Sequence, residues 1–224
     1  MTVAKYGTQS LRKKSGYCVA RHSQFLRRAE MYASFLRFCV PWLRTFYEGF
    51  MKFVRFNYRE KLMNIDQQIV RIIENAGVDI VCSVPCNLLG SVMELLDVGS
   101  VRHVPVTREE EGVGIAAGAA LAGCRPLLLM QNSGLGNCVN ALASLSGLYE
   151  LPLFLLMSHR GGESERIVAQ KPMGAAAPAV LDALGIPRTD IAKAADLEQL
   201  EASMRSAYAD SCVRAAFLEP ELWS

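Results

Sequence analysis

The amino-acid sequence predicts an α/β domain over residues 63–224, with a doubly wound, mostly parallel sheet and helices on both faces. Short apolar runs alternate along this region with segments of helical spacing, an order that builds one parallel sheet. The runs are almost continuously apolar, as expected of strands that are covered on both faces. Half of the chain, 51%, is hydrophobic, so a domain of this length can bury its core without a metal or a disulfide.

The elements can be assigned in order from this periodicity. Residues 66–75 are predicted as a helix, because Ile69, Ile72 and Ile73 fall on one side and Gly77 follows as a typical C-terminal stop. Apolar runs predict strands at residues 79–84, 101–106, 126–130, 153–157, 190–192 and 213–218. Helical spacing predicts helices at residues 87–96, 108–123, 137–148, 179–184 and 197–209, and the polar residues 158–174 are expected to form a loop.

Residues 1–62 form a basic, aromatic-rich N-terminal extension. They carry thirteen Lys and Arg against three Glu, whereas the rest of the chain carries eleven basic and nineteen acidic residues. The basic residues are scattered among large aromatics without a recognition motif, so we expect no nucleic-acid binding. Residues 31–58 could form an amphipathic interfacial helix, and the segment could instead be a targeting peptide. The simplest interpretation is that Met63 is the true start and that the extension is an artefact of the gene model.

Two compositional features bear on location. No apolar run approaches the ~18 residues that span a membrane, so we expect no transmembrane segment. The seven cysteines form no CxxC pair and mostly lie among apolar residues, which is typical of reduced core cysteines in a cytoplasmic protein.

Polar residues follow several predicted strands at the point where each strand ends. They include residues 85–87, 107–109, 131–136 and 158–161. Ligands of doubly wound sheets bind beyond the carboxyl ends of the strands, so all four segments are candidates for one site.

The segment Thr107-Arg108-Glu109-Glu110-Glu111 opens the helix predicted at 108–123. Thr107 and Glu110 have the spacing of a capping box, and acids in a first turn suit the helix dipole, so the segment has a structural explanation without any chemistry. Gly112, Gly114 and Gly118 each cost up to ~1 kcal/mol in a helix interior relative to Ala. Their presence indicates that a cofactor or a partner helix approaches this helix closely.

The second notable segment is Gln131-Asn132-Ser133-Gly134-Leu135-Gly136-Asn137, a loop between a strand and a helix. Its glycines permit a close backbone approach. It lacks the third glycine of a dinucleotide fingerprint and the Lys of a Walker A loop. An ordinary turn, or a phosphate cradle at a helix N-terminus, remain open on the residues alone.

Together the two segments resemble the pyrimidine-binding domain of thiamine-diphosphate decarboxylases, over about residues 63–218. Within that family the chain is most similar to the α subunits of sulfopyruvate decarboxylases, with phosphonopyruvate decarboxylases as near relatives. The resemblance implies that Glu109, nine residues before Gly118, is the catalytic glutamate that hydrogen-bonds the pyrimidine of thiamine diphosphate, which leaves Glu110 to cap the helix. It also implies that Pro85, Asn132 and Ser133 face the cofactor.

The resemblance further implies a small anionic 2-oxo acid as the substrate. Cys86 and Asn87 follow the Val-Pro turn that faces the substrate in related enzymes, although Asn87 could simply cap a helix. His159 and Arg160 suit a dianion, since Arg binds sulfonates and carboxylates and His transfers protons near neutral pH. Both could equally be an ordinary packing pair.

The family also needs a diphosphate-binding domain whose Gly-Asp-Gly motif helps to hold Mg²⁺, and no Gly-Asp-Gly occurs in this sequence. We therefore expect a separate β subunit that carries it, an active site within a hetero-oligomer, and an inactive isolated chain. The expected reaction is decarboxylation of 3-sulfopyruvate to sulfoacetaldehyde, a step of coenzyme M biosynthesis. The alternatives are another acid, such as phosphonopyruvate, or a non-catalytic flavodoxin-like binding module.

Overall fold

The computed structural model describes residues 63–163 and 165–224. They form a six-stranded sheet in which every pair of neighbours is parallel, in the order β2-β1-β3-β4-β6-β5. The strands are β1 (Ile80–Ser83), β2 (Arg102–Pro105), β3 (Pro126–Gln131), β4 (Leu153–Ser158), β5 (Arg188–Ile191) and β6 (Val213–Leu218). The predicted fold class is confirmed, while the interfacial helix considered at 31–58 lies outside the described residues.

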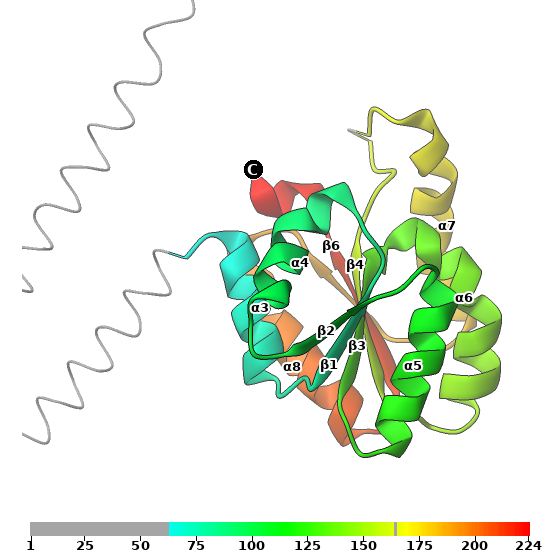
Figure 1. Cartoon of the computed structure of the whole chain (residues 1–224). Helices are drawn as coiled ribbons and strands as arrows, with labels where there is room; N and C mark the ends of the chain where they lie inside the picture. The colour runs from blue at the N-terminus through cyan, green and yellow to red at the C-terminus, as the bar shows by residue number, and fades with distance from the viewer. Residues whose placement is uncertain (1–62, 164) are drawn as a thin grey trace, which may run out of the picture. The chain divides into compact units, whose positions relative to one another are not determined.

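Helices cover both faces of the sheet (Figure 1). Residues of α3 (Ile65–Asn75), α4 (Gly90–Asp97) and α8 (Leu197–Ala209) share one apolar cluster with the sheet. Residues of α5 (Glu109–Leu121), α6 (Leu135–Ala141) and α7 (Lys171–Ala183) share the other. Among the described residues, no helix is both long and apolar enough to cross a membrane.

The central strands β3 and β4 divide their side chains between the two clusters. Leu127 and Leu129 pack on the side of α3, whereas Leu128 and Met130 pack on the side of α5. All four are fully buried. This two-sided burial explains why the strands read as continuous apolar runs rather than as alternating ones.

The strand order reverses at β1. The chain runs from β1 outward to β2 and then returns to β3 on the other side of β1. In doubly wound sheets such a reversal opens a crevice at the carboxyl ends of the two strands, which is where ligands bind. The end of β1 and the end of β3 are therefore the expected place for a site.

The start of α5 differs from the prediction. The helix begins at Glu109, and its N-cap residue Arg108 makes no side-chain capping bond. Glu111, rather than Glu110, reaches back, since its carboxylate accepts hydrogen bonds from the backbone N–H of Thr107 at 2.8 Å and from the Thr107 hydroxyl at 2.7 Å. The hydroxyl bond, followed by the backbone bond, lowers the pKa of Glu111. The difference arises because the helix starts one residue later than a capping box of Thr107 and Glu110 requires, which makes Glu111 the third residue of the helix.

The polar stretch after β4 is also more helical than predicted. The short helix expected at 179–184 is the second half of α7, which starts at Lys171 and tolerates Pro172 at its N-terminal end. Gly174 is buried in its first turns, where an added Cβ would collide with the backbone of Arg160 and Gly161. The first half of the helix differs from the prediction because its buried residues are Gly174 and Ala177, which carry little apolar signal.

A Ser–His–Asp chain of hydrogen bonds ties β1, β2 and α4 together. Ser83 Oγ lies 2.7 Å from His103 Nε2, and His103 Nδ1 lies 2.6 Å from the carboxylate of Asp97. The order resembles a hydrolase triad, but Ser83 is only 1% exposed. No substrate can approach a serine at that depth, so these hydrogen bonds serve to hold α4 against the sheet.

Candidate active site

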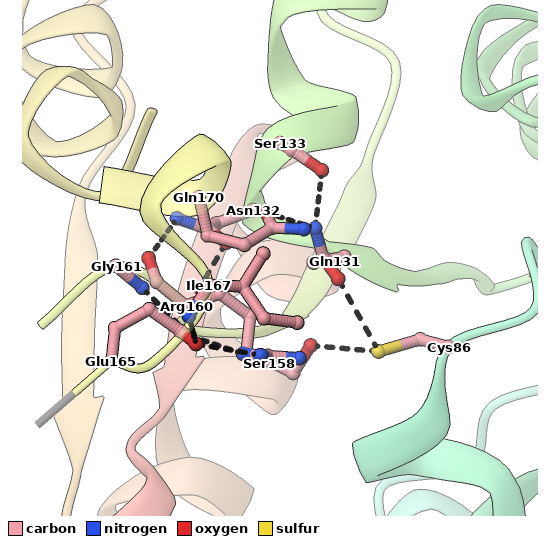
Figure 2. Close-up of polar contacts among 10 residues, drawn as sticks. All are labelled: Cys86, Gln131, Asn132, Ser133, Ser158, Arg160, Gly161, Glu165, Ile167 and Gln170. Atoms are coloured by element: carbon pink, nitrogen blue, oxygen red, sulfur yellow. Dashed lines mark hydrogen bonds and ion pairs between the residues drawn. The ribbon is translucent and has the colours of Figure 1, made fainter. Parts of the chain in front are cut away.

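The carboxyl ends of β1, β3 and β4 bring a group of polar side chains together (Figure 2). Cys86 Sγ, just after β1, lies 3.2 Å from the hydroxyl of Ser158 at the end of β4 and 3.9 Å from Gln131 Oε1 at the end of β3. Gln131 also donates from its amide to Ser133 at 2.6 Å and to Gln170 at 2.7 Å. Three strand ends and the approach to α7 thus meet at one edge, as the sequence predicts.

Glu109 is held in place by residues 134–137, which follow it in the sequence by 25 or more positions. Its carboxylate lies directly against Gly134, where an added Cβ would overlap both the carboxyl group and Cγ. Asn137 on α6 donates a hydrogen bond from Nδ2 to Glu109 Oε2 at 2.8 Å. The loop after β3 therefore forms a glycine cradle for this one side chain.

The neighbouring acids point elsewhere. Glu110 is exposed, and its closest cation is Arg108 at 3.9 Å, while Glu111 caps the helix through Thr107. The three consecutive glutamates thus have three different surroundings, and only Glu109 reaches the loop of residues 131–137.

Asn132 is placed differently from the expectation that it faces a ligand. It is fully buried, and its side chain bonds the backbone of Arg160 twice, accepting from the N–H at 3.0 Å and donating to the carbonyl at 3.0 Å. Its amide is therefore used to join the loop after β3 to the loop after β4. Ser133 is half-buried and Pro85 is exposed, both at the same edge of the sheet.

Arg160 does not present an open guanidinium. Its Nε and one terminal nitrogen donate to the two carboxylate oxygens of Glu165 at 2.6 Å and 2.9 Å. Glu165 also accepts from the backbone N–H groups of Gly161 and Ile167. The bonds from Arg160, and next the bond from Ile167, lower the pKa of Glu165 to about 2, so this carboxylate stays charged at neutral pH.

A cavity of about 420 Å³ opens beside this ion pair. Its lining includes Asn87, Arg160, Glu165 and Arg166. Arg166 is exposed, and no ion pair joins it to any other described residue. Two predicted residues, Asn87 and Arg160, therefore share one cavity, and Arg166 adds a cation that the sequence reasoning missed. No pattern singled out Arg166, because one Arg in a polar loop has no distinguishing neighbours.

His159, which the sequence analysis assigns to the substrate, is not among the residues that line this cavity. Its Nδ1 lies 2.7 Å from the carboxylate of Glu219, its Nε2 lies 3.2 Å from the carbonyl oxygen of Gly174, and its ring stacks on Phe217 at 4.4 Å. Both partners only accept hydrogen bonds, so the arrangement suits the doubly protonated ring. The bond with Glu219 raises the pKa of His159 against the opposing effect of burial.

This ion pair predicts a pH-dependent stability. The folded pKa of His159 lies above its unfolded value of about 6.5, so the stabilisation is complete below that value and is lost as the pH rises through the folded pKa. We expect His159→Gln to lower the thermal midpoint by about 2–4 °C in weak acid and by less in alkali. Thermal unfolding of both proteins across this range measures the difference, and a gap that stays constant with pH would contradict the assignment.

Residues 63–177 match the family described as thiamine pyrophosphate enzyme, N-terminal TPP binding domain. The chain belongs to this family. The thiamine pyrophosphate enzyme domain is similar to sulfopyruvate decarboxylase subunit alpha of Methanothermobacter thermautotrophicus, with 54% identity over 115 residues, 51% of this chain and 70% of the relative.

Two further comparisons extend beyond this match. A sulfopyruvate decarboxylase of Methanosarcina acetivorans is 36% identical over 162 residues, which are 72% of this chain but 42% of that protein. Among solved structures, a 2-oxoglutarate:ferredoxin oxidoreductase from Magnetococcus marinus superposes with a TM-score of 0.54 at 14% identity, over 71% of this chain and 29% of that one. At that identity the structural likeness bears on the fold alone.

Proposed function

We propose that this chain is the α subunit of a thiamine-diphosphate-dependent decarboxylase that converts 3-sulfopyruvate to sulfoacetaldehyde and CO₂. The observation that carries the proposal is the position of Glu109, whose carboxylate rests on Gly134 at the carboxyl edge of the sheet. The family match and the sulfopyruvate decarboxylase relatives support the cofactor and the substrate.

The residues at this edge fit the pyrimidine end of thiamine diphosphate. Gly134 has no side chain above the carboxylate, Asn137 holds one of its oxygens, and both Pro85 and Ser133 lie at the same edge. When bound, the cofactor supplies the electron sink for loss of CO₂. The role of Glu109 would be to donate a proton to the pyrimidine nitrogen or to share one with it, and the role of Pro85 and Ser133 would be to line the approach.

The cavity beside Arg160 suits an anionic 2-oxo acid. Arg160 and Arg166 both line it, and Glu165 balances only one of these two charges. We assign Arg166 to the distal anion of the substrate and Asn87 to a neighbouring polar contact. Cys86 precedes Asn87 and contacts Gln131 and Ser158 at the same edge of the sheet, and we assign it to the substrate side of the site.

The remaining machinery is assigned to a β subunit. The relative from Methanothermobacter is itself called a subunit alpha, and more than half of the Methanosarcina protein lies outside the region matched here. In this chain Gly114 and Gly118 on α5 are exposed and have open space above them, which a partner helix could fill. Within the described residues no three His, Cys, Asp or Glu side chains are grouped to hold a metal ion, and we place Mg²⁺ mainly on the β subunit. The free cysteines of the described residues are in keeping with the reducing cytoplasm.

The test is a decarboxylation assay of the full chain mixed with its cognate β subunit, thiamine diphosphate, Mg²⁺ and 3-sulfopyruvate. Each subunit alone serves as the control. We expect sulfoacetaldehyde only from the mixture. Turnover by the α chain alone would overturn the shared site.

Two other outcomes would change the assignment. Turnover of phosphonopyruvate in preference to sulfopyruvate would keep the chemistry and replace the substrate. A well-formed complex that decarboxylates no 2-oxo acid would point to a binding module instead.

A further inference from the structure

Asn137 makes a contact that the packing of its own helix does not require. It is an exposed residue near the start of α6, where no side-chain capping bond is made. Its Nδ2 nevertheless donates to Glu109 Oε2 at 2.8 Å, across 28 positions of the sequence. A solvated amide gains little from such a bond in stability alone, so the contact calls for another explanation.

The surroundings of Glu109 leave its two carboxylate oxygens in different situations. Oε2 is held by Asn137. Oε1 lies over Gly134 and makes no hydrogen bond within the part of the chain that the structure describes. Gly134 supports the carboxyl group of Glu109 from one side, and the side-chain amide of Asn137 fixes its rotation. Of the two carboxylate oxygens, Oε1 is therefore the one left to bind a ligand.

We infer that Asn137 is a positioning residue that holds Oε2 of Glu109 and thereby turns Oε1 toward the pyrimidine ring. The inference rests on the proposed function, because the pyrimidine of the proposed cofactor is the partner of Oε1. An amide suits this task, since it donates a hydrogen bond to the carboxylate without bringing a charge. A carboxylate at position 137 would place two acids within hydrogen-bond distance, and such a pair shares a proton.

The chain offers a matched control for this substitution. Asn140 is an exposed Asn three residues further along α6, and its side chain accepts a hydrogen bond from Ser144 at 3.3 Å. Asn137→Asp and Asn140→Asp add the same charge to the same helix. Only the first adds it beside Glu109.

The first readout is the titration of the Glu109 carboxyl group in the full chain without cofactor, followed by carbon-13 NMR and assigned by its loss in Glu109→Gln. We expect Asn137→Asp to raise the pKa of Glu109 by about one unit or more, and Asn140→Asp to leave it in place. Equal titration curves in the two Asp variants would overturn the inference. This readout does not depend on any catalytic activity.

The second readout is the pH profile of the complex with its β subunit. We expect Asn137→Ala to lower kcat about tenfold, as for loss of one charge-assisted hydrogen bond, with KM nearly unchanged, and Asn137→Asp to move the acidic limb to higher pH. If kcat and the pH profile are unaltered in both Asn137 variants while Glu109→Gln inactivates the complex, the positioning role of Asn137 is refuted and the proposed function stands. Normal turnover of Glu109→Gln would instead refute the proposed function.

Discussion

Glu109→Gln is expected to lower kcat of the assembled enzyme by about 10²–10⁴-fold, the range for losing a proton-transferring group. The glutamine has the same shape, and its amide oxygen can still accept the hydrogen bond from Asn137. The variant should therefore fold and bind its partner normally. Single-turnover decarboxylation, together with thermal unfolding of the same sample, separates loss of chemistry from loss of structure.

The matched control for this prediction is Glu110→Gln. Glu110 has the same charge in the same helical turn, but it is exposed and lies 3.9 Å from Arg108. We expect its kcat to remain within about twofold of wild type, since isolated surface ion pairs contribute little. If Glu110→Gln loses activity and Glu109→Gln does not, the register of the glutamate segment is wrong.

Gly134→Ala is expected to reduce kcat/KM by about 10²-fold, the cost of displacing a catalytic group by roughly an ångström. The backbone of Gly134 has φ −67° and ψ −20°, a conformation that alanine adopts readily. The effect therefore does not come from backbone strain. It comes from the added methyl group, which would overlap the side chain of Glu109 and force it off the cradle.

Gly136→Ala tests the same loop without touching Glu109. Among the residues that the structure describes, a Cβ at this position would meet Met173 alone, at an ordinary contact distance of 3.8 Å. We expect its activity and its thermal midpoint to stay close to wild type. Equal losses in the two alanine variants would indicate that the loop needs glycines for its backbone, and the cradle would then have no special role.

The two central strands show how far the sequence alone predicts the fold. The apolar runs at 126–130 and 153–157 correspond to β3 and β4 almost residue for residue, because burial on both faces leaves a continuous local signal. The start of α7 was missed because Gly174 and its alanine neighbours pack closely without an apolar pattern. Small residues are informative only once the surface that they approach is known.

Some features of the candidate site could also be predicted from the sequence, and others could not. Its location at the carboxyl edge follows from the alternation of strands and helices, since parallel strands bring all their carboxyl ends to one side. Glu109 could be selected from the family spacing to Gly118. Arg166 could not, because nothing local distinguishes it from other arginines in polar loops.

The sequence by itself determined the parallel α/β architecture and the edge of the sheet at which the polar side chains gather. Only the tertiary structure decided which polar groups are already occupied. Asn132 is taken up by the backbone of Arg160, Arg160 by Glu165, and His159 by Glu219. The physical reason is that periodicity reports burial along one segment, whereas a hydrogen-bond partner from a separate loop depends on how that loop folds back. His159 and Glu219 are 60 positions apart, and only the pairing of β4 with β6 brings them together.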